Sequence, residues 1–410
     1  MTAAFPSPEA FRDECRAFLE ARYPRRADVA QPFRWGEGSD AVGLFEEADP
    51  SEEAAQLTAV KEWRRALWDA GLAWISGPAA FGGRELPGPY QQIFDREARG
   101  FEVAGNGMLT ISLGMIAPTI VAHGTAGAKD RYLAALQRAD LVACQLFSEP
   151  GAGSDLASVS TRARRDGDGW RITGQKVWTS GAQYSDIGEV LCRTSDDGRH
   201  RNLTAFVLDM RAPGVEVRPL RQMTGGAAFN EVFFDDAWVP DDDRLGEVGG
   251  GWRVAITTLS NERAAIGGDG FGGAGLLNFD RYRQMAEVFG KGDDPVVRQR
   301  LADLLVHQRV ANYTRRRAAD ARRAGHAPGP EASIGKLALA QQFQRIGDFV
   351  GLVLGPKLVA DTGEWGTYAW AGLLQSTPGY RIGGGTDEVM RNIVAERVLG
   401  LPKEPGAAGR

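Results

Sequence analysis

The chain has 410 residues, of which 43% are hydrophobic and 25% charged, with a formal net charge of −5. This length exceeds what one hydrophobic core supports, so two or three domains are expected. The mild acidity argues against an extended basic surface for nucleic acid. Three widely spaced cysteines fit neither a CxxC metal pattern nor a disulfide framework, so we expect no metal site and a reducing compartment. We find no basic, apolar leader and no window with the roughly 18 apolar residues of a membrane helix, which predicts a cytoplasmic protein.

The first 140 residues are predicted to form an all-α domain. Phe11, Cys15 and Phe18 fall on one helical stripe and predict a helix from about 8 to 22. Residues 24–50 carry prolines, glycines and acids without a sustained period, which indicates a long excursion. The pattern then returns to helix as far as the end of this domain.

The remaining sequence predicts a β domain followed by a helical one. From 141 to 244, short β-prone runs alternate with turn dipeptides, which indicates a small antiparallel barrel or sandwich. Residues 245–410 are predicted to form a C-terminal helix bundle, because the helical period returns after three consecutive glycines. Apolar residues there step by 4, 3, 4 and 3 along one face: Leu339, Phe343, Ile346, Val350 and Val353. The fold class is α+β in the order α, β, α.

Two glycine-containing motifs stand close together in the β domain. Residues 148–155 read SEPGAGSD, and residues 174–181 read GQKVWTSG. Glycines at 151 and 153 let a backbone approach a planar ligand, serines supply hydroxyls, and a buried Trp178 walls the ligand's ring system. The two motifs together therefore favour a flavin-binding site. The alternative is a β-hairpin domain with polar turns and one core tryptophan.

The α, β, α order together with these two motifs resembles the acyl-CoA dehydrogenase family over nearly the whole chain. Residues 239–252, VPDDDRLGEVGGGW, are similar to the family's link into its third domain, and residues 383–400, GGGTDEVMRNIVAERVLG, to its terminal helix. The resemblance implies a C-terminal four-helix bundle and FAD held between this bundle and the β domain, with contacts from a neighbouring subunit. The residues that match FAD-contacting segments of the family are Gln145, Phe147, Ser148, Gly153, Ser154, Trp178, Thr179, Ser180, Thr386 and Glu388. Ser154 also matches a residue that faces the substrate's CoA portion, whereas Glu388 stands where an uncharged Gln is common.

The resemblance also implies the reaction, which is α,β-desaturation of a thioester. A carboxylate base removes the α-proton while hydride leaves the β-carbon for flavin N5. Many members place this Glu just before the Gly-Thr of the terminal motif, where this chain has Gly384. The family's other base position directly precedes an arginine on the first long helix of the bundle, where LSNERAAIGG places Glu262 before Arg263.

This combination is similar to isovaleryl-CoA and long-chain type enzymes. It implies that Glu262 is the base, that Gly384 offers its N–H to the developing enolate oxygen, and that Arg263 binds substrate. The alternative is that Glu262 and Arg263 are surface charges on an amphipathic helix.

Some family elements are altered. Residues 352–356 read LVLGP where a Gln-x-x-Gly-Gly pattern is expected, and Phe289-Gly290 lacks the arginine that the family has three residues ahead, for which Arg298 is a candidate substitute. A second function therefore stays open, that of a non-catalytic subunit completing a partner's FAD site in a mixed tetramer. An oxidase that passes electrons to oxygen is a further variant.

The resemblance implies three partners: an acyl-CoA or acyl-carrier thioester, electron-transferring flavoprotein as acceptor, and further copies of the chain in a homotetramer or homodimer. A competing signal is the GxGxxG pattern at Gly268, Gly270 and Gly273. A nicotinamide site needs this pattern between a strand and a helix, whereas here it lies between two helical stretches, so we do not expect that cofactor.

Overall fold

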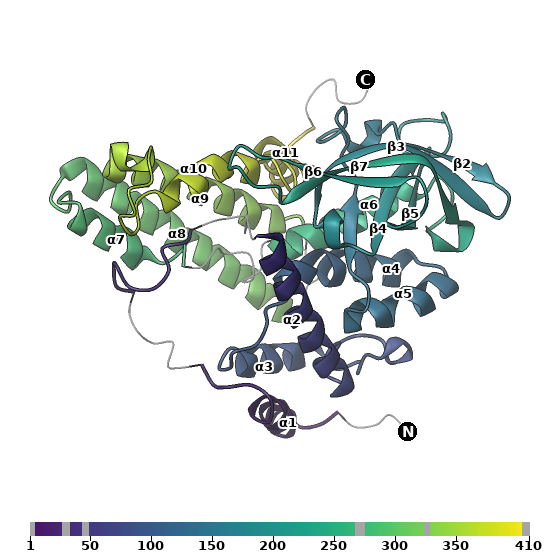
Figure 1. Cartoon of the computed structure of the whole chain (residues 1–410), viewed down its shortest axis with the longest axis horizontal. Helices are drawn as coiled ribbons and strands as arrows, with labels where there is room; N and C mark the ends of the chain where they lie inside the picture. The colour runs from purple at the N-terminus through teal and green to yellow at the C-terminus, as the bar shows by residue number, and fades with distance from the viewer. Residues whose placement is uncertain (1–4, 27–32, 43–48, 267–274, 324–328, 404–410) are drawn as a thin grey trace. The chain divides into compact units, whose positions relative to one another are not determined.

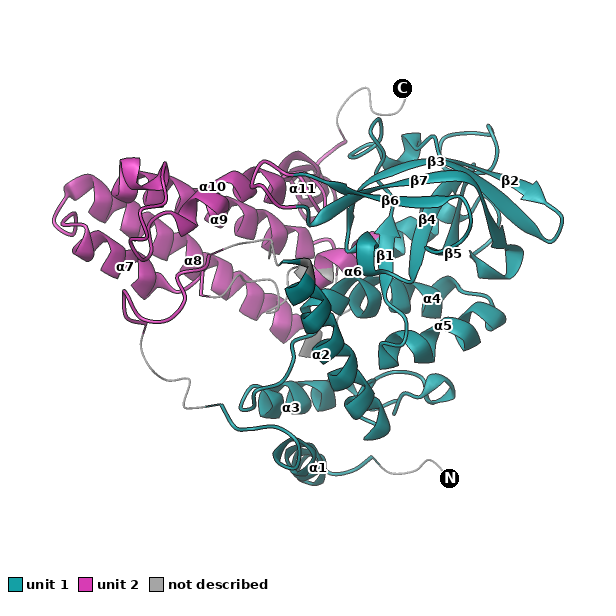
Figure 2. Ribbon diagram, in the orientation of Figure 1, with its two compact units in different colours: residues 1–31, 48–221, 227–258 teal, residues 32–47, 222–226, 259–410 magenta. Residues whose placement is uncertain are grey.

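The chain divides into two compact units (Figure 2). The first comprises residues 1–31, 48–221 and 227–258, and the second comprises residues 32–47, 222–226 and 259–410. The computed structural model describes residues 5–26, 33–42, 49–266, 275–323 and 329–403. The predicted class is confirmed, since a helical N-terminal region is followed by a β-sheet region and a helical C-terminal region. The predicted borders at 140 and 244 stay a prediction, because the first unit contains both the early helices and the sheet.

The early helices of the first unit precede its sheet along the chain (Figure 1). They are α1 Pro8–Glu20, α2 Pro50–Asp69, α3 Gly88–Ala98, α4 Ala117–His123 and α5 Ala126–Arg138. The Ser7 side chain caps α1 by accepting a hydrogen bond from Ala10 N–H at 3.1 Å. Phe11, Cys15 and Phe18 are buried in the core that α1 shares with α2 and α3. This helix therefore begins and packs as the sequence predicts.

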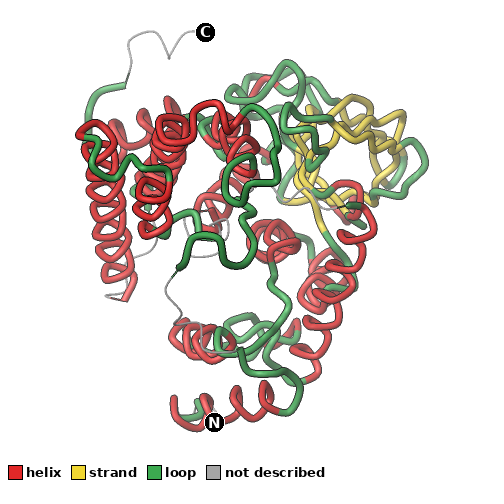
Figure 3. Tube along the Cα trace, turned by 60° about the vertical axis from the view of Figure 1, so that its left-hand side comes forward, coloured by secondary structure: helices red, strands yellow, loops and turns green. Residues whose placement is uncertain are grey.

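The strands of the first unit form one sheet, gathered together in Figure 3. They are β1 Ala143–Leu146, β2 Arg162–Asp166, β3 Gly169–Ser180, β4 Ile187–Arg193, β5 Leu203–Asp209, β6 Val215–Leu220, β7 Phe229–Pro240 and β8 Arg244–Leu245. Their order is β6-β7-β3-β2-β4-β5-β8, with β1 pairing with β4. The sheet is mainly antiparallel, but β1 and β2 run parallel to β4. All three cysteines are buried and free, as expected for small apolar residues of the core.

The second unit is helical. Its helices are the last part of α6 Gly251–Ile266, then α7 Phe279–Val288, α8 Pro295–Arg323, α9 Ala332–Leu354, α10 Ala369–Tyr380 and α11 Asp387–Ile393. The predicted stripe on α9 is confirmed: Phe343, Ile346, Val350 and Val353 are buried in one core, and Leu339 packs against it. The pattern Gly268, Gly270, Gly273 lies outside the described residues.

Part of the excursion predicted between 24 and 50 belongs to this second unit. Trp35 N–H donates to Gln284 Oε1 at 2.8 Å, and the Trp365 indole donates to Gly38 O at 2.9 Å. Within the described residues 33–42, specific hydrogen bonds therefore join the excursion to the helices of this unit. No helix within the described ranges is long and apolar enough to cross a membrane.

Candidate active site

The SEPGAGSD segment forms a closed turn directly after β1. Glu149 N–H donates to Ala152 O at 2.9 Å, and Ala152 N–H donates back to Glu149 O at 3.1 Å. A Cβ added at Gly151 or Gly153 would meet no heavy atom within 4 Å. Gly153 and Ser154 are exposed. The turn therefore presents an open face on which a ligand can lie against the backbone.

A buried ion pair joins this turn to β3, and sequence reasoning missed it. Lys176 Nζ donates to Glu149 Oε1 at 2.8 Å and to Phe147 O at 3.0 Å. The same carboxylate accepts hydrogen bonds from Ser160 N–H at 2.6 Å and from Thr161 N–H at 2.9 Å. Burial alone would raise the pKa of Glu149, but the charge and hydrogen bonds of Lys176 and Ser160 outweigh it and bring that pKa to about 2. An ionised pair thus fixes the two predicted motifs against each other.

Trp178 departs from the prediction of a buried wall. Its side chain is 58% exposed, and its φ is 63°, in the left-handed region. The cause is a bulge in the pairing of β3 with β7 between Lys176 and Thr179, which breaks the alternation of the strand. The indole lies edge-on to Phe229, with ring centroids 5.9 Å apart. Such backbone conformations of bulky residues concentrate at ligand sites.

Thr179 carries an unsatisfied polar group at the same place. Its side chain is 1% exposed, and no described residue exchanges a hydrogen bond with its Oγ1. Phe147 is buried, whereas Gln145, Ser148 and Ser180 are half-buried. These features fit a planar ligand that can accept or donate hydrogen bonds, as the flavin of FAD does. The glycine turn is open, the indole is exposed, and the Thr179 hydroxyl has no hydrogen-bond partner among the described residues.

A second buried carboxyl, on Glu189 of β4, was also missed. It pairs in register with Gln145 of β1 and is fully buried. Burial raises the pKa of Glu189 to about 8, and a hydrogen bond from Thr258 opposes this only in part. Thr258 Oγ1 lies 2.8 Å from the carboxyl and 3.0 Å from the hydroxyl of Thr119 on α4. This polar cluster anchors α6 one turn before Glu262. The available signal was an acidic residue inside the apolar run IGEVLC.

The predicted base and substrate residue lie on the last turns of α6. Glu262 and Arg263 are both half-buried. Arg263 Nη2 donates to Ser260 Oγ at 3.1 Å. Burial lowers the pKa of Arg263, and the Glu262 carboxylate opposes this fall. Both side chains are therefore partly withdrawn from solvent, and their assignment as base and substrate residue stays a prediction.

The loop between α10 and α11 contains Gly384. Gly384 and the following Gly385 have φ of 68° and 95°, a region that favours glycine. The loop is closed by Arg381 and Asp387: Arg381 Nε donates to Asp387 Oδ2 at 2.9 Å, and Asp387 N–H donates to Arg381 O at 3.0 Å. Within the described chain, no backbone carbonyl or side chain accepts a hydrogen bond from Gly384 N–H. This N–H is therefore available to a ligand.

The two predicted FAD contacts of α11 differ in character. The Thr386 hydroxyl caps the helix by accepting a hydrogen bond from Val389 N–H at 3.2 Å. Glu388 is exposed and pairs with Arg391 at 3.4 Å. Its own backbone amide, as the main cause, lowers the pKa of Glu388. Thr386 therefore has a structural role besides any contact with a cofactor.

Lys336 of α9 connects the base to the loop, and it too was missed. Its side chain is 3% exposed, and its ammonium donates to Gly385 O. Burial lowers the pKa of Lys336, and the charges of Asp387, Glu262 and Glu388 oppose this fall. Glu262 and the Gly384 loop are thus both within electrostatic reach of one buried ammonium. The signal in the sequence was a lysine inside the apolar run SIGKLALA.

The predicted residues therefore form two groups, one in each unit. Residues 145–180 of the first unit lie at the turn and along β3. In the second unit, the loop of residues 384–388 binds Lys336, and the charge of Glu262, which precedes Arg263 on α6, acts on the same lysine.

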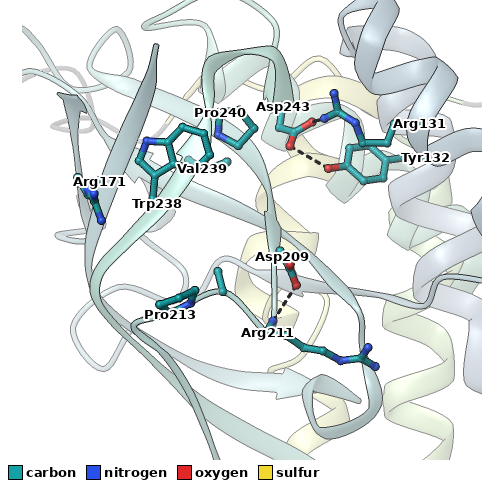
Figure 4. Close-up of a pocket in the computed structure, with 11 residues that line it drawn as sticks. Arg131, Tyr132, Arg171, Asp209, Arg211, Pro213, Trp238, Val239, Pro240 and Asp243 are labelled. Carbon is teal, nitrogen blue, oxygen red and sulfur yellow. Dashed lines mark hydrogen bonds and ion pairs between the residues drawn. The ribbon is translucent and has the colours of Figure 1, made fainter. Parts of the chain in front are cut away.

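A cavity of about 460 Å³ in the first unit holds none of the predicted site residues (Figure 4). Its arginines already have acidic partners, since Arg131 pairs with Asp243, and Arg211 pairs with Asp186 at 2.6 Å. We assign these groups a structural role.

Known proteins resemble the chain in both units. Residues 144–237 match the acyl-CoA dehydrogenase middle domain, and residues 249–399 match the acyl-CoA dehydrogenase C-terminal domain. The chain is 38% identical to acyl-CoA dehydrogenase FadE34 of Mycobacterium tuberculosis, covering 85% of the chain but only 48% of that relative. It is 37% identical to acyl-CoA dehydrogenase IpdE1 of the same organism, covering 87% of the chain and 91% of that relative.

A similar fold is present in the crystal structure of the ChsE4-ChsE5 complex from Mycobacterium tuberculosis. The TM-score is 0.71 at 26% identity, and the match covers 98% of this chain and 100% of the other. Together with the domain matches and the identity to IpdE1, this agreement extends over nearly the whole sequence. The chain therefore belongs to the acyl-CoA dehydrogenase family, whose members are FAD-dependent oxidoreductases that dehydrogenate acyl-CoA thioesters.

Proposed function

We propose that this chain desaturates an acyl-CoA thioester between its α and β carbons, with Glu262 as the base. The observation that supports this proposal is that the buried ammonium of Lys336 binds the Gly384 loop through Gly385 O, while the charge of Glu262 acts on the same ammonium. Glu262 removes the α-proton, and the N–H of Gly384, to which no described residue offers an acceptor, donates to the thioester oxygen as negative charge develops there. Because residue 384 is a glycine, the position at which many family members carry the catalytic glutamate has no carboxylate here.

The FAD of the family would be held by the residues that fit it in the first unit and by Thr386 and Glu388. Trp178 supplies an exposed aromatic face, and the Thr179 hydroxyl supplies a buried polar atom without a partner among the described residues. When bound, FAD accepts the β-hydride. Ser154, exposed on the turn, and Arg263, partly desolvated on α6, are proposed to bind the CoA portion and the acyl end of the substrate.

The test is anaerobic bleaching of the flavin spectrum in the purified chain by a panel of acyl-CoA thioesters. Glu262→Gln is expected to abolish bleaching while the yellow spectrum is retained, because an amide cannot accept the α-proton. Glu364→Gln is the matched control, since this exposed glutamate pairs with Lys357. If Glu262→Gln bleached as fast as the parent chain, the assignment of the base would be wrong.

The second candidate is a subunit that completes the FAD site of a different partner chain. Ala286 occupies the position three residues before Phe289, where the family has its arginine, and it lines a cavity of about 620 Å³ together with Arg283 and Arg298. One similar structure is a complex of two differently named proteins. If the chain purified alone carried no FAD and acquired it only with a partner, this candidate would replace the first.

Assembly, acceptor and location remain proposals as well. We propose a homotetramer or homodimer, because Val306, Val310 and Tyr313 recur at helical spacing on α8 with exposed side chains. The mass of the purified chain in solution, measured by light scattering, tests this. Electron-transferring flavoprotein as acceptor is tested by its reduction during turnover, and a cytoplasmic location by fractionation of cells.

A further inference from the structure

We propose that Lys336 is a positioning residue for the dehydrogenation, which holds the Gly384 loop in place. This inference rests on the proposed function of Glu262. It concerns a residue of α9 that belongs to neither of the motifs from which the site was predicted.

The first step is the contact with the loop. A lysine that is 3% exposed needs a polar partner, and Lys336 finds it in the carbonyl of Gly385. Gly384 and Gly385 both have left-handed φ and lack side chains that would fix them by packing. The N–H of Gly384 therefore keeps its direction through the hydrogen bond from Lys336 on one side and the Arg381 to Asp387 closure on the other.

The second step is the electrostatic surroundings. The charged groups that act on Lys336 are Asp387, Glu262 and Glu388, with Arg381 as an opposing cation. Asp387 is already bound to Arg381 at 2.9 Å, and Glu388 is 72% exposed, so solvent screens it. Glu262 is the half-buried carboxylate of this set.

The third step is reciprocity. The attraction between two charges is one energy, so a lysine whose protonated form is favoured by Glu262 favours the carboxylate of Glu262 to the same extent. Arg263, next to Glu262 on α6, is a second cation that interacts with this carboxylate. Burial and the positive charge of Arg397 both lower the pKa of Arg263. The charges of Lys336 and Glu262 therefore stabilise each other.

The experiment compares Lys336→Met and Lys336→Arg with the parent chain. Lys357→Met serves as a control, because this exposed lysine pairs with Glu364 outside the site. One readout is the rate of anaerobic flavin bleaching across pH. The other is hydrogen–deuterium exchange of the peptide 381–388 in the chain without substrate, which does not depend on turnover.

Lys336→Met is expected to move the midpoint of the bleaching profile to higher pH by about half a unit to one unit, which slows bleaching about three- to tenfold on the acid side. Exchange in the 381–388 peptide should rise. Lys336→Arg should restore the midpoint, and the control should change neither readout. If Lys336→Met does not fold, Lys336→Gln keeps an amide donor without the charge and should show the shifted midpoint with less change in exchange.

The failures are distinguishable. An unchanged midpoint and unchanged exchange in Lys336→Met, together with loss of bleaching in Glu262→Gln, would overturn the role of Lys336 and leave the proposed function intact. Normal bleaching by Glu262→Gln would overturn the proposed base, and with it the effect of Lys336 on pH. A raised midpoint that Lys336→Arg does not lower would also count against the inference, since charge would not be its cause.

Discussion

Replacing Lys176 with methionine tests the buried pair that joins the SEPGAGSD turn to β3. Lys176 is fully buried and Glu149 is 6% exposed, so the carboxylate left behind would have little access to water. Methionine has nearly the length of lysine and fills most of its volume, so the main change is the loss of the cation. The turn would then keep its backbone bonds but lose its attachment to Phe147 O.

Two independent estimates give the size of the effect. Removing one partner of a buried ion pair typically costs about 3–5 kcal/mol. A glutamate whose pKa falls from 4.5 to about 2 on folding contributes about 3 kcal/mol of stability at neutral pH. The free energy of unfolding should therefore fall by about 3 kcal/mol at pH 7. Because the pKa of Glu149 is depressed, this contribution is present above its ordinary value and is lost as the pH falls from 4.5 toward 2.

The assay is urea unfolding followed by far-UV circular dichroism at pH 7 and at pH 3.5. The difference between Lys176→Met and the parent chain should be smaller at the lower pH. Lys129→Met on α5 of the same unit is the control, and Glu149→Gln in the Lys176→Met background should recover part of the loss by removing the stranded charge. A loss below about 1 kcal/mol, or one that does not change with pH, would refute the reasoning.

Three further substitutions probe groups that the site leaves strained or unsatisfied. Because the pKa of Glu189 is raised to about 8, stability should fall as the pH rises from 4.5 toward 8. Glu189→Gln should therefore stabilise the chain by about 4 kcal/mol at pH 8 and hardly at all at pH 4 in urea titrations. Trp178→Gly should change the free energy of unfolding by less than about 1 kcal/mol, since relief of the positive φ offsets the lost contact with Phe229. The same variant should lose FAD on desalting, and retention equal to the parent would contradict its role. Thr179→Val should stabilise the FAD-free chain by about 1 kcal/mol, because it removes a buried hydroxyl with no described partner, and it should weaken FAD binding measured by fluorescence.

The parts of the fold that depend on local periodicity were predictable. The apolar stripes of α1 and α9 follow from the spacing of apolar residues within a single helix. The α, β, α order followed from the same kind of signal. The parallel pairing of β1 with β4 did not, because it joins segments about forty residues apart and leaves no pattern within either strand.

The site was predictable only where a motif carries it. The turn at 148–155 was found from its glycines, but the exposure of Trp178 arises from a bulge whose position is set by pairing with β7. Strand alternation places this indole inward, and one extra residue reverses that placement. Resemblance to a family identifies residues that contact a ligand. It does not identify the buried side chains that hold those residues in place.

Those underlying groups share one physical property. Lys176, Glu189 and Lys336 are ionisable side chains buried in the protein, where an isolated charge costs several kcal/mol. Each is placed against a segment that the predicted chemistry needs: the first against the SEPGAGSD turn, the second against α6, and the third against the Gly384 loop. An apolar residue would satisfy the core at these positions with less cost. Their presence is explained if the function gained by fixing these three segments outweighs the free energy of unfolding that is lost by burying the charges.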